Sequence, residues 1–90
     1  MRVALICTDK PGALQTRMDT RSAHLDYIAA TGVVEIAGPF LDAEGKMTGS
    51  LVMLSVDSLQ AAQDWAAGDP YAKAGLFGQV DIREWKKVIG

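Results

Sequence analysis

The sequence of 90 residues contains one cysteine, one histidine and three prolines, and it has no long apolar run. A single cysteine cannot form a disulfide within the chain, and no cysteine and histidine residues cluster at the spacing of a zinc site. No stretch approaches the roughly 20 apolar residues that a membrane-spanning helix needs. These shortages exclude a disulfide-rich scaffold and predict a protein without a metal site or a membrane span.

Charge of either sign is also modest. The 9 lysine and arginine residues nearly balance 11 acidic residues, and they form no patch along the sequence. Because nucleic-acid binding normally requires such a patch, we expect no nucleic-acid partner. The apolar run after Met1 resembles a signal peptide only superficially, since it is short and meets polar residues where a cleavage site should lie. We expect one cytoplasmic domain spanning residues 1–90.

Patterns typical of strands and helices alternate along the chain. Short apolar runs bounded by turn residues predict four strands: Val3–Thr8, Val33–Phe40, Gly49–Val56 and Phe77–Trp85. Helical spacing predicts two helices, Gln15–Thr31 and Leu59–Gly68, with a further short turn over residues 70–75. The resulting order is β-α-β-β-α-β. This order predicts an α+β, ferredoxin-like fold with an antiparallel sheet in the order 4-1-3-2.

The predicted central strands, the first and the third, are apolar on both faces. Because right-handed crossovers place both helices on one face of the sheet, the other face would be bare and apolar. We therefore expect a homodimer that packs through this open face, with either Leu51 and Met53 or Val52 and Leu54 towards the partner. Cys7 lies within the first strand, where we expect it to be a small buried side chain.

The first predicted helix has an apolar stripe at three-to-four spacing, formed by Met18, Ser22, Leu25 and either Ile28 or Ala29. This stripe would face the sheet and leave His24 on its rim. Thr20 is a second candidate for the start of the helix, because threonine favours capping positions. Gly32 is a suitable C-terminal cap.

The predicted topology brings His24 and Asp69 to the same end of the sheet, because the first helix starts there and the second helix ends there. Imidazole exchanges a proton readily near neutral pH. A neighbouring carboxylate fixes its tautomer and strengthens it as a proton acceptor. Arg21, one helical turn before His24, could hold an anionic group of a substrate.

Each of these residues also has a structural interpretation. Asp69 followed by Pro70 is typical of a helix N-cap and first helical position. A rim histidine is often solvated, and Arg21 could form a surface ion pair. Tyr71 is typical of packing, and Ser50 of an ordinary strand position.

Several short motifs follow one another along the chain: Arg21-x-x-His24-Leu25, Gly32, Ala37-Gly38-Pro39, Gly45 with Gly49-Ser50, Asp69-Pro70-Tyr71, Ala74-Gly75-Leu76 and Trp85. Together they resemble the YciI-like (YCII-related) family, of the dimeric α/β-barrel superfamily. The resemblance implies a ferredoxin-like fold that forms a dimeric α/β barrel. It also implies a histidine–aspartate dyad, which corresponds to His24 and Asp69. Ser22 departs from the family pattern, since many members have proline there.

We therefore predict an enzyme without cofactors that performs metal-free acid–base chemistry on a small cyclic or aromatic acid or phenol. His24 and Asp69 would be catalytic. The predicted substrate-binding residues are Arg21, Gly38, Pro39, Ser50 and Tyr71. A non-catalytic ligand-binding or accessory module is the first alternative. A purely structural dimer is the second, and it predicts no cavity beside His24.

Overall fold

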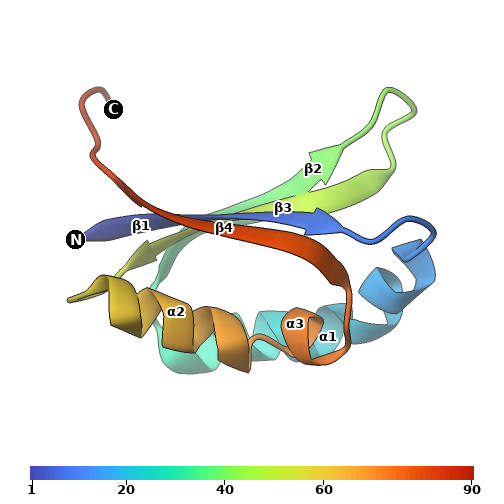
Figure 1. The fold of residues 1–90 in the computed structure, drawn as a ribbon, viewed down its shortest axis with the longest axis horizontal. Coiled ribbons are helices and arrows are strands. Elements are labelled where there is room, and N and C mark those ends of the chain that lie inside the picture. The colour runs from blue at the N-terminus through green and yellow to red at the C-terminus, as the bar shows by residue number, and fades with distance from the viewer.

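The computed structural model describes all 90 residues and has the predicted order of elements (Figure 1). The elements are β1 (Arg2–Asp9), α1 (Leu14–Thr31), β2 (Val34–Leu41), β3 (Met47–Ser55), α2 (Leu59–Gly68), α3 (Pro70–Lys73) and β4 (Phe77–Trp85). The short turn predicted after α2 is thus the helix α3. No helix combines the length and the apolar character needed to cross a membrane.

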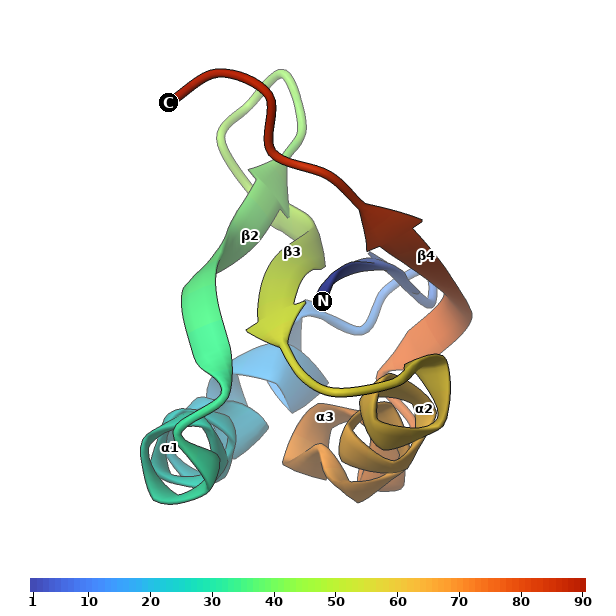
Figure 2. The same ribbon diagram turned by 90° about the vertical axis from the view of Figure 1, so that its left-hand side faces the viewer.

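The four strands form one antiparallel sheet in the order β2-β3-β1-β4, which confirms the predicted ferredoxin-like topology. The two strands that are apolar on both faces, β1 and β3, are the central ones. All three helices lie on one face of the sheet (Figures 1 and 2). On the other face, the β2–β3 hairpin and the residues after β4 rise on either side of an uncovered surface.

The core lies between the sheet and the helices. Its buried residues are Val3, Leu5 and Cys7 from β1, Val52 and Leu54 from β3, and Ala62 and Trp65 from α2. The core also shows which residues of β3 face the open side of the sheet, a point that the sequence left undecided. Val52 and Leu54 face the helices, so Leu51 and Met53 face the opposite, uncovered side. Cys7 is buried among apolar side chains, as predicted.

The prediction for the buried face of α1 is wrong. Met18 and Leu25 are 56% and 46% exposed, whereas Arg17 and His24 are 2% and 6% exposed. His24 therefore lies at the centre of the buried face and not on its rim. The helix also begins at Leu14, so Thr20 is not its cap. Leu59, the first residue of α2, is 42% exposed.

The actual inward stripe of α1 consists of Arg17, Arg21, His24 and Ile28, which follow one another at spacings of four, three and four residues. Its first three residues each lie one position before a residue of the predicted apolar stripe, and Ile28 belongs to both stripes. It was missed because its side chains are mostly polar, and polar residues on a helix normally face solvent. A polar stripe turned towards a sheet requires partners for its charges. Those partners define the site described below.

Local capping contacts fix the remaining elements. Gly32 ends α1 with a positive φ of 67°, as predicted. The Ser58 hydroxyl accepts a hydrogen bond from the Ala61 N–H at the start of α2. In the β2–β3 hairpin, Asp42 Oδ1 accepts hydrogen bonds from the backbone N–H groups of Glu44 and Lys46.

Candidate active site

The structure brings His24 and Asp69 into direct contact. His24 Nδ1 lies 2.8 Å from Asp69 Oδ1, and both side chains are buried. Asp69 is also the N-cap of α3, since the same Oδ1 accepts a hydrogen bond from the Tyr71 N–H at 3.0 Å. The capping role and the contact with His24, which the sequence presented as alternatives, therefore coexist in one carboxylate.

The contact with Asp69 determines which imidazole nitrogen can accept a proton. Asp69 Oδ1 already accepts the Tyr71 N–H, and the roles in its bond with His24 follow from the imidazole tautomer. In the tautomer in which Nδ1 donates to Asp69, Nε2 is the nitrogen without a proton. Nε2 has no hydrogen-bond partner within the chain, and no buried side-chain nitrogen or oxygen lacks a partner. It follows that Nε2 is open to solvent on the cavity side.

Tyr71 holds the imidazole from one face. The two rings stack with their centroids 4.0 Å apart and their planes at 17°. Tyr71 is itself buried and makes an edge contact with Phe77 of β4. Burial raises the pKa of the Tyr71 hydroxyl although the positive charge of Arg17 lowers it, so this phenol stays protonated at neutral pH. Tyr71 therefore packs as predicted and also positions His24.

Arg17 lines the candidate site and was missed by the sequence reasoning. Its Nε and Nη2 atoms donate to the two carboxylate oxygens of Asp9 at 2.7 and 2.8 Å. Nη2 also donates to the Ser50 hydroxyl at 2.9 Å. Burial alone would lower the pKa of the guanidinium, but the hydrogen bonds and charge of Asp9 outweigh it and raise the pKa. Arg17 is therefore a fixed, fully charged group.

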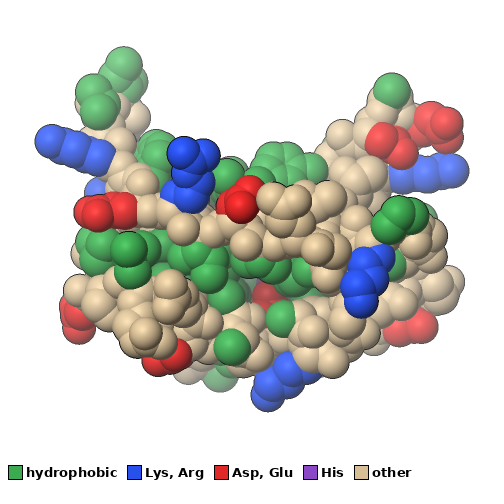
Figure 3. All heavy atoms as spheres, viewed as in Figure 1, with side chains coloured by type: hydrophobic (Ala, Val, Ile, Leu, Met, Phe, Trp, Pro, Cys, Tyr) green, Lys and Arg blue, Asp and Glu red, His purple; other side chains and the backbone are tan.

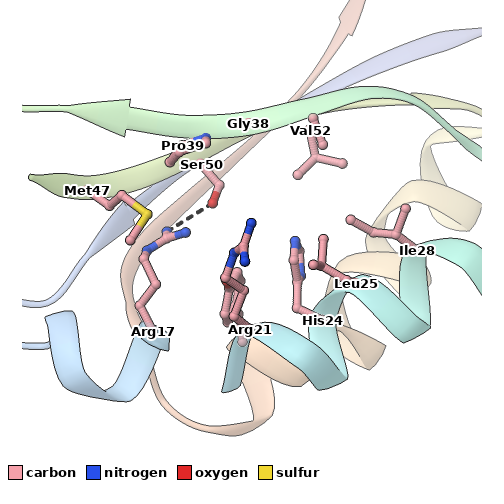
Figure 4. A pocket seen from close by; sticks show the side chains of 12 residues that line it. Arg17, Arg21, His24, Leu25, Ile28, Gly38, Pro39, Met47, Ser50 and Val52 are labelled. Atoms are coloured by element: carbon pink, nitrogen blue, oxygen red, sulfur yellow. Dashed lines mark hydrogen bonds between the residues drawn. The ribbon is translucent and has the colours of Figure 1, made fainter. Parts of the chain in front are cut away.

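A cavity of about 160 Å³ lies between α1 and the strands β2 and β3. Figure 4 shows Arg17, Arg21 and His24 pointing from α1 towards the strand residues that form the opposite wall. All the predicted substrate-binding residues line this cavity: Arg21, Gly38, Pro39, Ser50 and Tyr71. Asp69 does not line it and lies behind His24. The purely structural alternative predicted no cavity beside His24, and that prediction is wrong.

Three basic side chains line the cavity, and each is positive when charged: Arg17, Arg21 and His24. No carboxylate is among the lining residues. Arg21 forms no ion pair in the structure, so the surface ion pair considered for it is absent. Apolar side chains such as Leu25, Ile28 and Val52 supply much of the remaining wall. The cavity is suited to a small apolar ring that carries acidic oxygen groups.

Cys7 is not a nucleophile of this site. Burial, with a smaller contribution from the Asp69 charge, raises the pKa of the Cys7 thiol to about 12. Because the thiolate and not the thiol is the reactive form, this cysteine is inert at neutral pH. No group of three or more histidine, cysteine, aspartate or glutamate side chains is placed to hold a metal ion.

The sequence was compared with protein families and with known proteins. The model of the YCII-related domain matches residues 1–86. The chain belongs to the YCII-related family. This confirms the resemblance seen in the sequence motifs. Among its YCII-related relatives, an uncharacterised protein of Haemophilus influenzae is 36% identical, and the match covers 99% of this chain and 100% of the relative. Protein YciI of Escherichia coli is 34% identical with the same coverage.

Solved structures share the fold of this chain. A 5-chloro-2-hydroxyhydroquinone dehydrochlorinase from Burkholderia phenoliruptrix, in complex with 2,5-dihydroxybenzoquinone, is 33% identical with a TM-score of 0.88. The match covers 96% of this chain and 94% of the dehydrochlorinase. An antibiotic biosynthesis monooxygenase matches with a TM-score of 0.61 at 11% identity, covering 98% of each chain. This second likeness concerns the fold alone.

Proposed function

We propose that this protein is a small cytoplasmic enzyme that uses His24 and Asp69 for metal-free acid–base catalysis on a single-ring organic acid or phenol. The observation that carries the proposal is the orientation of His24. Its Nδ1 atom is held by Asp69, while Nε2 has no partner within the chain and is open on the cavity side. An oriented imidazole with one free nitrogen is suited to remove a proton from a bound molecule.

The size of the cavity supports a substrate with one six-membered ring. Its volume is about 160 Å³. An apolar protein cavity of about 150 Å³ is known to accommodate benzene. One ring with small substituents therefore fits beside His24, whereas a fused bicyclic compound would extend into solvent.

The reaction that these groups support is an elimination or an isomerisation. Nε2 of His24 takes a proton from the substrate, and the electrons of the broken bond form a new double bond. In an elimination the leaving group then departs with its bonding electron pair. In an isomerisation the imidazolium returns the proton to another atom of the substrate. Asp69 keeps the imidazole oriented and stabilises its positive charge while the proton is held there.

The dehydrochlorinase provides independent support for this chemistry. Its name describes an elimination of hydrogen chloride from a chlorinated, hydroxylated ring, and its structure contains a dihydroxylated quinone. At 33% identity over 96% of this chain, it is similar enough to suggest the substrate class for a first test. The catalytic roles assigned here rest on the geometry of His24 and Asp69 and not on that name.

The test is chloride release from 5-chloro-2-hydroxyhydroquinone under anaerobic conditions, with wild-type protein and the His24→Asn variant. We expect the variant to lose at least about 100-fold in turnover, because a general base contributes about 10²- to 10⁴-fold. Its affinity for 2,5-dihydroxybenzoquinone should stay within a few-fold of wild type. Equal turnover in both proteins would contradict the proposal. Binding of the quinone by wild type without any turnover would favour a non-catalytic binding module.

We also propose that the protein forms a homodimer through the uncovered face of the sheet. On this face Ile36 and Phe40 are exposed, and Ile6 and Leu51 are partly exposed. Figure 3 shows apolar side chains gathered along this side of the molecule, between the two projecting arms. An apolar surface of this kind is rarely left open to water. A second copy that packs sheet against sheet would cover it.

A further inference from the structure

We propose that Met47 is a gate between the cavity beside His24 and a second hollow, and that this hollow receives a short chain attached to the ring of the substrate. This inference rests on the proposed function, because it adds a substituent to the substrate bound at the same site. The substrate class is a single six-membered ring that carries a short flexible chain on one edge.

The second hollow lies between the residues that follow β1 and the β2–β3 hairpin. We call it the hairpin hollow. It is lined by residues 9–14 and by Asp42, Lys46, Met47 and Thr48. Its volume is about 230 Å³, larger than the cavity of about 160 Å³ beside His24. Met47 is the one residue that lines both spaces, so its side chain separates them.

The rest of the partition is a fixed ion pair. Arg17 lines the cavity, and Asp9 lines the hairpin hollow. Two hydrogen bonds of 2.7 and 2.8 Å join them, and both side chains are buried. Figure 4 shows Met47 and Arg17 at the same end of the row of lining side chains, with Ile28 at the other end. The end of the cavity towards the hollow therefore has one rigid part and one part formed by Met47.

Met47 is the movable part of this partition. Its side chain is unbranched, has three rotatable bonds and adapts to irregular spaces. The residue is only partly buried, and it begins β3 where the register with β2 is irregular. A change of its rotamer can join the two spaces while the pair of Arg17 and Asp9 stays intact. A branched or aromatic side chain would form a stiffer wall.

The positions of His24 and Met47 determine how the ring would lie. His24 follows Arg17 by seven residues on α1, which is about 10 Å along the helix axis. A ring beside His24 therefore turns its far edge towards Arg17 and Met47. A short chain on that edge passes Met47 and enters the hairpin hollow, where Pro11, Ala13 and Leu14 supply apolar surface.

The test measures binding and needs no turnover. Its two probes are 2,5-dihydroxybenzoquinone and the derivative that carries a propyl chain on one of the two free ring carbons, which are equivalent by symmetry. Their affinities are measured by calorimetry for wild type, Met47→Ala, Met47→Ile and Ala13→Phe. Ala13→Phe fills the hairpin hollow from the start of α1, where Ala13 makes no side-chain capping bond.

We expect wild type to bind the propyl derivative about 4- to 60-fold more tightly than the parent quinone, because each buried methylene contributes about four-fold. Met47→Ala should keep this preference, since the passage stays open. Met47→Ile should lose it, because a β-branched side chain cannot swing aside. Ala13→Phe should also lose it without changing the affinity for the parent. Ala30→Phe, on the exposed side of α1 and outside both spaces, is the matched control and should keep the preference.

A crystal structure of Met47→Ala is a second test that needs no ligand. The cavity beside His24 and the hairpin hollow should form one continuous space in this variant. Two spaces that stay separate would overturn the inference. A wild type without preference for the propyl derivative, or a folded Ala13→Phe that keeps the preference, would overturn it as well.

Failure of the proposed function has a different result. If His24→Asn keeps full turnover while the affinities respond to Met47 and Ala13 as expected, the catalytic proposal fails and the gate stands. If His24→Asn loses turnover while the propyl chain brings no gain in affinity, the gate fails and the catalytic proposal stands. Absence of binding by both quinones to every protein would overturn the ligand class of both proposals.

Discussion

Asp69 Oδ1 lies 2.8 Å from Nδ1 of His24, although 45 positions separate the two residues in the sequence. The same oxygen accepts the Tyr71 N–H that begins α3, and the Tyr71 ring stacks on His24. Asp69, which is both the helix cap and the carboxylate, and Tyr71, which supplies the stacking ring, thus belong to one short segment. Formation of α3 therefore also orients the imidazole, so the local fold and the orientation of His24 depend on the same hydrogen bonds.

The two roles of Asp69 can be separated by comparing Asp69→Asn with Asp69→Ala. Asparagine caps helices about as well as aspartate, so Asp69→Asn should keep most of the stability. It removes the charge that orients the imidazole and stabilises imidazolium, so turnover should fall by about 10²- to 10⁴-fold. Asp69→Ala should lose turnover and in addition about 1–2 kcal/mol of stability, as for other lost caps. Denaturant unfolding and turnover measure the two effects, and full activity of Asp69→Asn would show that the charge is not needed.

The fold could be predicted because it depends on patterns that repeat along the chain. Because β1 and β3 have apolar residues on both faces, they were predicted to be the central strands of the sheet, as observed. The proximity of His24 and Asp69 followed from this topology, since the direction of each element decides which ends meet. The capping residue Gly32 acts locally and could therefore be identified from neighbouring residues alone.

The orientation of α1 could not be predicted by the same reasoning. Apolar residues at Met18 and Leu25 suggested an inward face, but the helix buries Arg17 and His24. These polar side chains are stable inside because each has a carboxylate partner outside α1: Asp9 at the end of β1 and Asp69 at the start of α3. Hydrophobic periodicity contains no information about such partners. A spacing of four and three residues between Arg17, Arg21 and His24 was the one signal in the sequence that could have indicated a polar inward stripe.

Cys7 makes the stability sensitive to alkaline pH. Burial raises its pKa from 9.0 to about 12, so the folded protein keeps a proton that the unfolded chain releases. The free energy of unfolding is unaffected by this group below pH 9 and should fall between pH 9 and 12, by up to about 1.4 kcal/mol per pH unit. In Cys7→Ala this part of the pH dependence should be absent, even if its stability at neutral pH is lower. Urea unfolding across this pH range checks it, and parallel curves for both proteins would contradict it.

Gly49 is required for the close pairing of β1 and β3. A Cβ atom at this position would collide with the backbone carbonyl oxygen of Cys7, which cannot move without disturbing the strand. Gly49→Ala should therefore lower the free energy of unfolding by about 1–3 kcal/mol. Gly38→Ala on β2 is the matched control, because a Cβ there meets no atom within 4 Å. Its effect should be within about 1 kcal/mol and can be stabilising. Equal effects of the two substitutions on chemical denaturation would refute the steric argument.

The last prediction concerns assembly through the uncovered face of the sheet. Ile36 is 64% exposed in the single chain and lies on the same face as Met53, with which it pairs. A substitution by aspartate should cost the monomer little, because the charge stays in water. In a two-fold dimer it would bury two unpaired charges, one from each copy, at a cost of several kcal/mol.

We therefore expect wild type to be a dimer at micromolar concentration and Ile36→Asp to be a folded monomer. Met18→Asp is the matched control, because Met18 is 56% exposed on α1, which lies in the helix layer on the opposite side of the sheet. This variant should remain dimeric. Light scattering gives the mass of each protein, and circular dichroism verifies that each is folded. A monomeric wild type, or a folded Ile36→Asp that still dimerises, would show that this face is not the interface between subunits.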